Sequence, residues 1–246
     1  MNRLSFNNVT FVYPAKKDPK PVINGLSFEV PKGRFLVILG SSGSGKTTIV
    51  KLTAGLLSPS SGSIVFSGVD SSILKGTDRH IGYVSQAATN YSFLSVFQNI
   101  ALPLKAEKVP LQEIEERVGE VADSLGISFL LGRKPKELSL GQQQKVSLAR
   151  AIVKNPDLYL LDEPFSSLDF PSRSSLRKDL DFLHKKKEAT IIMVSHDIND
   201  ALLLSDWVIL LNQGSIVQEG DIHSLMNHPK NAFVQSFFTS KESDHD

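Results

Sequence analysis

Between residues 35 and 48 the chain reads Phe35-Leu36-Val37-Ile38-Leu39-Gly40-Ser41-Ser42-Gly43-Ser44-Gly45-Lys46-Thr47-Thr48. Its first five residues form a continuous apolar run, typical of a strand that helices cover on both faces of a parallel sheet. Residues 40–47 then fit the pattern G-x-x-x-x-G-K-[ST], and a helix is expected from Thr47 to about Leu56. A buried strand, a glycine-rich loop and a helix in this order predict a nucleotide-binding α/β protein.

The glycine-rich loop has the chemistry of a phosphate cradle. Its glycines let backbone N–H groups turn inward towards phosphate oxygens, and the N-terminus of the following helix adds partial positive charge. Lys46 is expected to reach the β- and γ-phosphates of ATP, and the Thr47 hydroxyl to bind Mg²⁺. The residues predicted to bind ATP here are Gly40, Ser41, Ser42, Gly43, Ser44, Gly45, Lys46, Thr47 and Thr48.

A second apolar run, from Leu158 to Leu161, leads into two carboxylates, Asp162 and Glu163. Acids at the end of a buried strand could simply be solvated, but in a chain that also carries a phosphate-binding loop we expect them to have a function. One carboxylate can hold the Mg²⁺ ion, while its neighbour orients or deprotonates the attacking water. We assign Asp162 to the metal and Glu163 to the water.

The rest of the chain alternates between strand and helix patterns. Strands are expected at residues 4–11, 26–30, 64–66, 81–84, 158–161, 190–194, 207–211 and 215–218, and helices at 172–187 and 197–204. A bulge or turn is expected at Asn7-Asn8, and a polar, proline-rich loop at 13–21. From about Ser95 to Leu131 the period changes, and a set of apolar residues recurs at helical spacing. That set is Leu111, Ile114, Val118, Val121 and Leu125.

Composition excludes several classes of protein. The 246 residues are 41% hydrophobic and 22% charged, which indicates a globular protein. With no cysteine there is no disulfide scaffold, thiolate metal site or cysteine nucleophile. The formal net charge of +1 argues against a nucleic-acid partner, and Lys185-Lys186-Lys187 is interpreted as a solvated helix end. The apolar runs are too short for a transmembrane helix and no secretory signal is apparent, so any membrane role is expected to be peripheral.

Four further motifs stand in a fixed order around the two sites. Gln86 follows the strand expected at 81–84, and Leu138-Ser139-Leu140-Gly141-Gln142 opens a helix that continues to Ala151. Ser167-Leu168-Asp169 follows Glu163, and His196 follows the strand that ends at Val194. With these motifs the chain resembles the ATP-binding subunits of ABC transporters over almost its entire length. The stretch 214–221, with His228-Pro229 and Phe233-Val234 after it, is similar to that of bacterial importers.

The resemblance implies an α/β fold: a P-loop NTPase with a RecA-like core, an N-terminal antiparallel β subdomain and an inserted helical lobe. Residues 1–86 would form the β subdomain and the P-loop part of the ATPase core. Residues 87–155 would form the helical subdomain that carries the signature. Residues 156–238 would complete the core, and 239–246 would be a polar tail. No large regulatory domain is expected after it.

The resemblance also implies roles for individual residues. Gln86 would be the Q-loop glutamine, a catalytic residue and a third Mg²⁺ ligand beside Thr47 and Asp162. Asp169 would be the D-loop aspartate, and His196 the switch histidine that contacts the γ-phosphate and the catalytic water beside Glu163. Tyr13, which could also be an ordinary strand aromatic, would stack on adenine.

The signature motif departs from the family pattern at one position. Ser139, Leu140, Gly141 and Gln142 would contact the ATP that a second subunit holds, but Leu140 stands where the family has glycine. We expect Leu140 to project away from the phosphate and the site to work. Ser139 is a plausible N-cap for the helix that follows.

The implied assembly is a pair of ATPase subunits, identical or closely paralogous, that sandwich two ATP molecules and drive separate integral membrane permease subunits. The chain would lie at the cytoplasmic face of the inner membrane as an ATPase, with ATP and Mg²⁺ as cofactors, and solute import is the expected function. Alternatives are a lipid-handling or mechanotransmitting complex, or a soluble ABC protein acting on ribosomes or DNA. The aromatic cluster Tyr91, Phe93, Leu94 and Phe97 is either core of the helical lobe or a groove for the permease.

Overall fold

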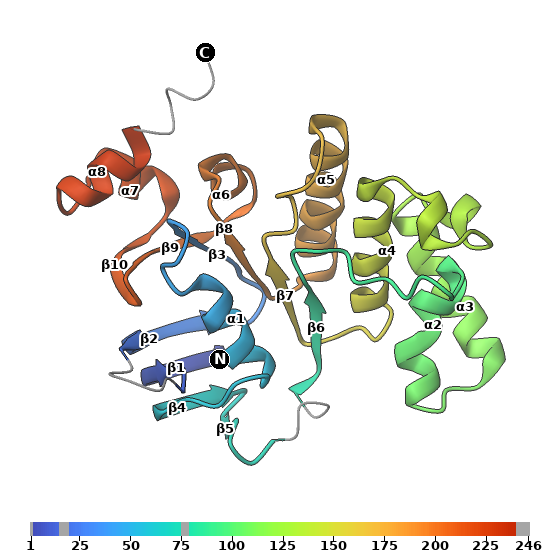
Figure 1. Ribbon diagram of the computed structural model, residues 1–246, viewed down its shortest axis with the longest axis horizontal. Helices are drawn as coiled ribbons and strands as arrows, with labels where there is room; N and C mark the ends of the chain where they lie inside the picture. The colour runs from blue at the N-terminus through green and yellow to red at the C-terminus, as the bar shows by residue number, and fades with distance from the viewer. Residues whose placement is uncertain (1, 15–19, 75–78, 240–246) are drawn as a thin grey trace.

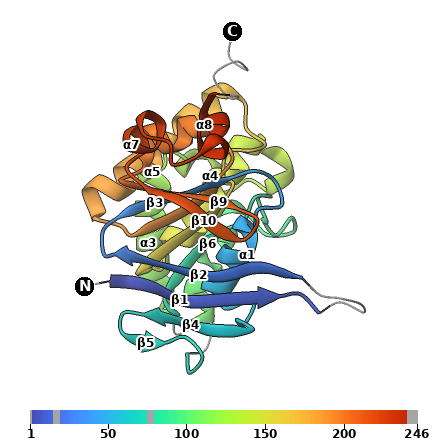
Figure 2. The ribbon, with the colours of Figure 1, turned by 90° about the vertical axis from the view of Figure 1, so that its left-hand side faces the viewer.

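The computed structural model describes residues 2–14, 20–74 and 79–239 of the chain. The polar loop expected at 13–21 and the tail expected at 239–246 fall partly outside these ranges. Within these described ranges two sheets form the framework, one of four strands and one of six (Figures 1 and 2).

The four-stranded sheet is the antiparallel subdomain that the sequence predicts. Its order is β2-β1-β4-β5, with β1 Asn2–Val12, β2 Pro21–Pro31, β4 Ser61–Phe66 and β5 Val69–Asp70. Phe6 pairs with Phe28, and their rings stack with centroids 4.6 Å apart. The pairing register shifts between Phe6 and Val9, and Asn8 adopts a φ of 50°. The irregularity expected at Asn7-Asn8 is therefore confirmed.

The six-stranded sheet is the mostly parallel core. Its order is β10-β9-β3-β8-β7-β6, and only the β10–β9 pair is antiparallel. The strands are β3 Phe35–Gly40, β6 Ile81–Val84, β7 Leu158–Asp162, β8 Ile191–Ser195, β9 Trp207–Asn212 and β10 Ser215–Gly220. Every residue of β3, β7 and β8 is buried, as their continuous apolar runs predict.

Side chains alternate across the core sheet and so divide the core in two. Leu36 and Ile38 face a cluster shared with the antiparallel sheet and with α1, Lys46–Ala54. Val37 and Leu39 face the cluster that the remaining helices complete. The period of two in an extended chain therefore lets one strand, β3, support both layers.

The remaining helices are α2 Val96–Ala106, α3 Leu111–Ser124, α4 Leu140–Ile152, α5 Phe170–Lys187, α6 Ile198–Leu204, α7 Ile222–Asn227 and α8 Ala232–Thr239, with 3₁₀ turns at Ser128–Leu130 and Pro135–Glu137. Helices α2 to α4 form the lobe on the right of Figure 1. The helical spacing of Ile114, Val118, Val121 and Leu125 marks its buried face, but Leu111, counted with them, is exposed because it begins α3 at the lobe surface. In the described residues no helix is both long and apolar enough to cross a membrane.

Candidate active site

Three loops meet at one edge of the core sheet because three parallel strands end there side by side. β8 lies between β3 and β7, pairing Leu39 with Ser195 and Val194 with Asp162. The segments that begin at Gly40, Glu163 and His196 therefore leave the sheet together. Their separation along the chain gives no hint of this contact, which depends on strand order.

The glycine-rich loop wraps around the ammonium group of Lys46. Gly43 and Gly45 adopt φ angles of 78° and 108°, the left-handed region in which glycine is favoured. Lys46, the first residue of α1, is only 5% exposed. Its Nζ donates to the carbonyl oxygens of Gly40, at 2.8 Å, and Ser41, at 3.0 Å. The loop thus holds a buried positive charge at the helix N-terminus, where a phosphate would bind.

Thr47 and Asp162 form an oxygen-donor pair beside this loop. The Thr47 hydroxyl donates to Asp162 Oδ1 at 3.2 Å, joining α1 to the end of β7. Burial raises the pKa of the Asp162 carboxyl, the hydrogen bond from Thr47 opposes this, and the charge of Glu163 adds to the rise. A buried carboxylate next to a second acid and a hydroxyl is a donor set that suits a hard cation such as Mg²⁺.

Gln86 follows the end of β6. Among the hydrogen bonds of the described residues, none joins Gln86 to Thr47 or Asp162. Instead Gln86 is exposed and lines a cavity of about 270 Å³ with residues that include Leu140 and Ser167. Its assignment to the metal stays a prediction.

Glu163 lies between Lys46 and His196. Its Oε1 is 3.8 Å from Lys46 Nζ, and its Oε2 is 3.1 Å from His196 Nδ1. The backbone φ of Glu163 is 46°, an unusual conformation outside glycine that costs roughly 1–3 kcal/mol. Its N–H nevertheless donates to Val194 O at 3.0 Å, so the neighbouring strand β8 fixes the turn. A strained turn thus directs a carboxylate towards a lysine and a histidine.

Tyr13 lies beside the start of α1. Its hydroxyl is 3.4 Å from Thr48 Oγ1, and its ring meets Phe11 edge-on with centroids 4.7 Å apart. The Tyr13 side chain is exposed. An exposed aromatic next to the phosphate-binding loop is available for stacking, and its contact with adenine stays a prediction.

The signature motif opens α4 as predicted. Ser139 is its N-cap: the hydroxyl accepts from the N–H of Gln142 at 3.3 Å, and the Ser139 N–H donates to Gln142 Oε1 at 3.0 Å. Leu140 is 58% exposed, whereas a Cβ on Gly141 would collide with the Ser172 side chain of α5. The small residue at position 141 is therefore required for α4 and α5 to approach.

Asp169 caps the neighbouring helix. Its carboxylate accepts from the N–H of Ser172 at 3.1 Å at the start of α5, and this bonding lowers the pKa of Asp169. The signature and Asp169 consequently lie close together. In Figure 1 they are carried by α4 and α5, on the other side of β7 from α1 and the phosphate-binding loop.

One residue beside the Thr47–Asp162 pair has no motif in the sequence. Tyr83 of β6 lies close enough to Asp162 for the two side chains to interact. Burial, followed by the charge of Asp162, raises the pKa of Tyr83 to about 12. The phenol therefore stays neutral beside the carboxylate. Its register opposite Leu160 places it there, which becomes visible only once β6 and β7 are paired.

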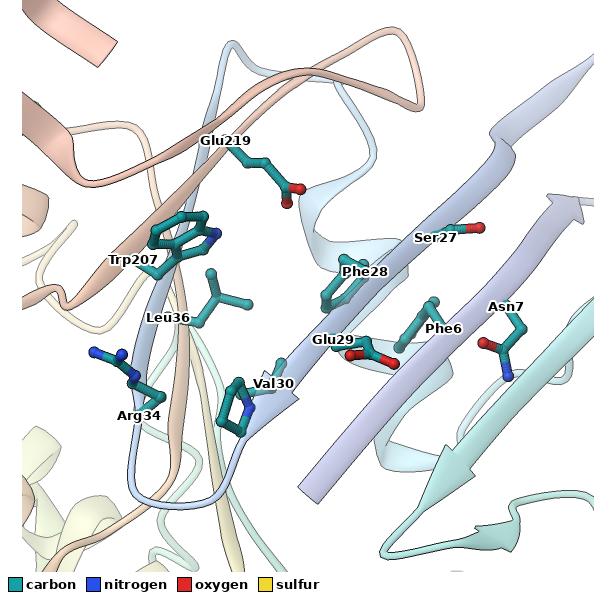
Figure 3. A pocket seen from close by; sticks show the side chains of 11 residues that line it. Phe6, Asn7, Ser27, Phe28, Glu29, Val30, Arg34, Leu36, Trp207 and Glu219 are labelled. Carbon is teal, nitrogen blue, oxygen red and sulfur yellow. The ribbon is translucent and has the colours of Figure 1, made fainter. Parts of the chain in front are cut away.

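A larger cavity of about 570 Å³ lies elsewhere, between β2 and the first residues of β3 and β9. Figure 3 shows Trp207 and Leu36 on one side of it and Phe28 and Val30 on the other. It contains none of the predicted site residues. The cavity lies at the start of β3, whereas the phosphate-binding loop follows the end of β3. The cavity and the loop are therefore at opposite ends of the strands of the core sheet.

Comparison with known proteins identifies a protein family that this sequence matches. Residues 23–166 match the family model described as ABC transporter. The molybdate/tungstate import ATP-binding protein WtpC of Pyrococcus horikoshii is 42% identical over 86% of this chain and 61% of its own length. The trehalose/maltose import ATP-binding protein MalK of Thermococcus litoralis is 42% identical over 89% and 60%. An ABC transporter ATP-binding protein of Sinorhizobium fredii, y4fO, is 39% identical over 95% and 68%.

A solved structure is also similar. It is the dimeric, post-hydrolysis state of an ATP-binding cassette bound to ADP and Pi, with a TM-score of 0.81 and 28% identity, covering 89% of this chain and 98% of that one. The similarity confirms the predicted P-loop NTPase fold. The chain spans about 60% of the length of the two import proteins, WtpC and MalK.

Proposed function

The chain belongs to the ABC transporter family, and from that premise we propose that it is the ATP-hydrolysing subunit of an importer. The convergence of Lys46, Glu163 and His196 carries this proposal. The Glu163 carboxylate lies 3.8 Å from the buried Lys46 ammonium and 3.1 Å from the His196 imidazole, at a phosphate-binding loop. This arrangement suits phosphoryl transfer to water better than simple nucleotide storage.

Each residue has a role that its position supports. Lys46 and the loop N–H groups bind the β- and γ-phosphates, and Glu163 accepts a proton from the attacking water or orients it. His196 donates a hydrogen bond towards the γ-phosphate as negative charge develops there. Thr47 and Asp162 would hold Mg²⁺, which, when bound, offsets the charge of the phosphates.

The exposed signature supports a paired assembly. Ser139 and Leu140 are exposed at the start of α4, and Figure 1 shows α4 on the other side of β7 from α1, the helix that follows the phosphate-binding loop. We propose that this signature contacts the ATP held by a second copy or a close paralogue. Two such contacts related by symmetry would make a self-complementary interface.

Exposed aromatics support a membrane partner. Phe93 is 71% exposed and Tyr91 is also exposed, whereas Phe97 packs against the core of the lobe. Of the two interpretations of this cluster, core packing therefore suits Phe97 and a docking surface suits Tyr91 and Phe93. We propose that a permease binds here and holds the chain peripherally at the inner face of the membrane.

Copurification from membranes tests the transporter assignment. ATP hydrolysis by the chain together with capture of a multi-spanning permease is the expected result. Recovery of ribosomes or DNA would support the soluble alternative, and recovery of a complex that moves no solute would support mechanotransmission. ATP hydrolysis that is the same in the wild type and in Glu163→Gln would contradict the catalytic assignment.

His196→Ala should slow turnover more than it weakens ATP binding. The imidazole donates to charge that grows in the transition state, so its loss should lower kcat by ~10²–10³-fold. The dissociation constant of ATP should change less than about threefold, since Lys46 and the loop still bind the phosphates. Steady-state hydrolysis with the permease present, and nucleotide titration, would measure the two effects. Unchanged kcat would make His196 a structural residue.

Leu140→Gly should be tolerated or mildly activating. Leu140 is exposed at the first position of α4, so little buried area is lost. The added backbone freedom costs up to ~1 kcal/mol. Thermal unfolding and ATPase rate would measure the change. A gain of several orders of magnitude in rate would show that the natural loop is impaired.

A further inference from the structure

The orientation of the His196 imidazole depends mainly on the backbone that carries it. Its side chain is 54% exposed, and its hydrogen bond to Glu163 is the contact that links it to the site. The direction of an exposed ring depends on the turn that carries it. The turn from Ser195 to Asp197 between β8 and α6 therefore decides where His196 points.

Buried polar groups hold that turn on both sides of the histidine. The Ser195 hydroxyl accepts from the N–H of Asp197 at 3.0 Å and donates to Asp200 Oδ2 at 2.6 Å. Asp200 is only 2% exposed, and burial raises the pKa of its carboxyl while the hydrogen bonds from Ser195 and Arg177 oppose that rise. A buried carboxylate that lost its partners would be costly, so this arrangement is strongly defined.

Two arginines of α5 complete the arrangement. Arg177 Nε donates to Asp200 Oδ1 at 3.0 Å, and Arg173 donates to Asp197 Oδ2 at 3.0 Å. Both also reach the loop after Glu163: Arg173 donates to Phe165 O at 3.4 Å, and the Arg177 guanidinium lies 5.5 Å from the centre of the Phe165 ring. The same two side chains thus contact the loop of Glu163 and the loop of His196.

Little free space remains between these loops. The gap that Glu163, His196, Arg173 and Asp200 help to line has a volume of about 10 Å³, room for about one water molecule. A shift of either loop would therefore displace packed neighbours. A misplacement of about 1 Å in catalytic groups can cost on the order of 100-fold in rate.

We propose that Arg177, acting through Asp200 and Ser195, is a positioning residue that sets the orientation of His196 for ATP hydrolysis, with Arg173 as its partner on Asp197. This inference rests on the proposed ATPase function. It gives a role in hydrolysis to Arg177, Asp200 and Ser195, which nucleotide binding alone does not require. It also links α5, which Asp169 caps, to the catalytic turn.

Kinetics of Arg177 variants would test the proposal in the full chain, with Mg²⁺ and ATP. Arg177→Gln should lower kcat by ~10–100-fold while the ATP dissociation constant changes less than about threefold. Arg177→Lys should recover part of the rate, because the ammonium can still donate to Asp200. Arg177→Gln leaves the buried Asp200 carboxylate without its ion-pair partner, which destabilises the fold. The double variant Arg177→Met/Asp200→Leu removes both charges. It should therefore fold and still show the low kcat.

A double-mutant cycle distinguishes positioning from general stability. In a His196→Ala background Arg177→Gln should cost less than about threefold more, because its target is gone. The control is His184→Gln on the same helix, which removes a half-buried contact to Asp206 at 3.1 Å far from the catalytic turn. It should lower the melting temperature and leave kcat unchanged.

Two outcomes would overturn the inference alone: a normal kcat in Arg177→Met/Asp200→Leu, or losses from Arg177→Gln and His196→Ala that simply multiply. A wild-type chain that hydrolyses no ATP would overturn the proposed function together with this inference.

Discussion

Glu163→Gln should trap an ATP-bound dimer. The amide keeps the shape of the carboxylate but cannot act as a base, so hydrolysis should fall by ~10²–10⁴-fold. Lys46, Thr47 and Asp162 are unchanged, so the proposed nucleotide and Mg²⁺ sites should stay intact. Each uncleaved ATP would then remain between the Lys46 loop of one subunit and Ser139 of the other. A ligand that binds the dimer more tightly than the monomer shifts association by mass action.

Size-exclusion chromatography with light scattering would follow this association. The variant should be monomeric without nucleotide and dimeric with ATP. Adding Ser139→Arg should disperse the dimer, because the bulky side chain would block the facing phosphate site. A dimer that survives Ser139→Arg would show that the interface lies elsewhere. A variant that stays monomeric at high ATP, also with the permease present, would contradict the ATP sandwich.

Lys46→Ala should abolish ATP binding at physiological concentrations. Each hydrogen bond from a charged group to phosphate contributes ~1.5–3 kcal/mol, so losing the ammonium should raise the dissociation constant by ~10²-fold or more. The carbonyl oxygens of Gly40 and Ser41 would also lose their donor, which should disorder the cradle. Fluorescent-nucleotide titration would measure the affinity.

Thr53→Ala on the same helix would be a matched control for Lys46→Ala. Thr53 is buried and its hydroxyl donates to Ile49 O at 2.8 Å, away from the phosphate-binding loop. It should bind ATP as the wild type does, even if the helix is less stable. Wild-type affinity in Lys46→Ala would refute the assignment of the loop.

Local sequence determined the parts of the site that depend on near neighbours. The apolar run 35–39, the glycines 43 and 45 and Lys46 together define a strand, a turn and a helix start, because each property acts over a few residues. Ser139 could be identified as a cap for the same reason, since its partner Gln142 is three residues away. Strand positions followed from runs and alternation, with ends displaced by a few residues.

Only the tertiary structure decided which of these parts meet. Glu163 and His196 touch because β8 inserts between β3 and β7, an order that no local pattern encodes. The same long-range pairing places Tyr83 beside Asp162. Leu111 fits the helical period yet lies outside the core, because periodicity defines a face but not how far packing extends along it.

The contacts of Arg177 show the distinction most clearly. In the sequence it is one of several charged residues on a helix, where a solvated role is the ordinary expectation. In the structure it reaches Asp200, 23 residues further along the chain, and through it the turn of His196. The residue types and motifs thus determined the chemistry, while contacts between distant segments determined the geometry in which that chemistry can occur, because such contacts form only when the sheets and helices pack together.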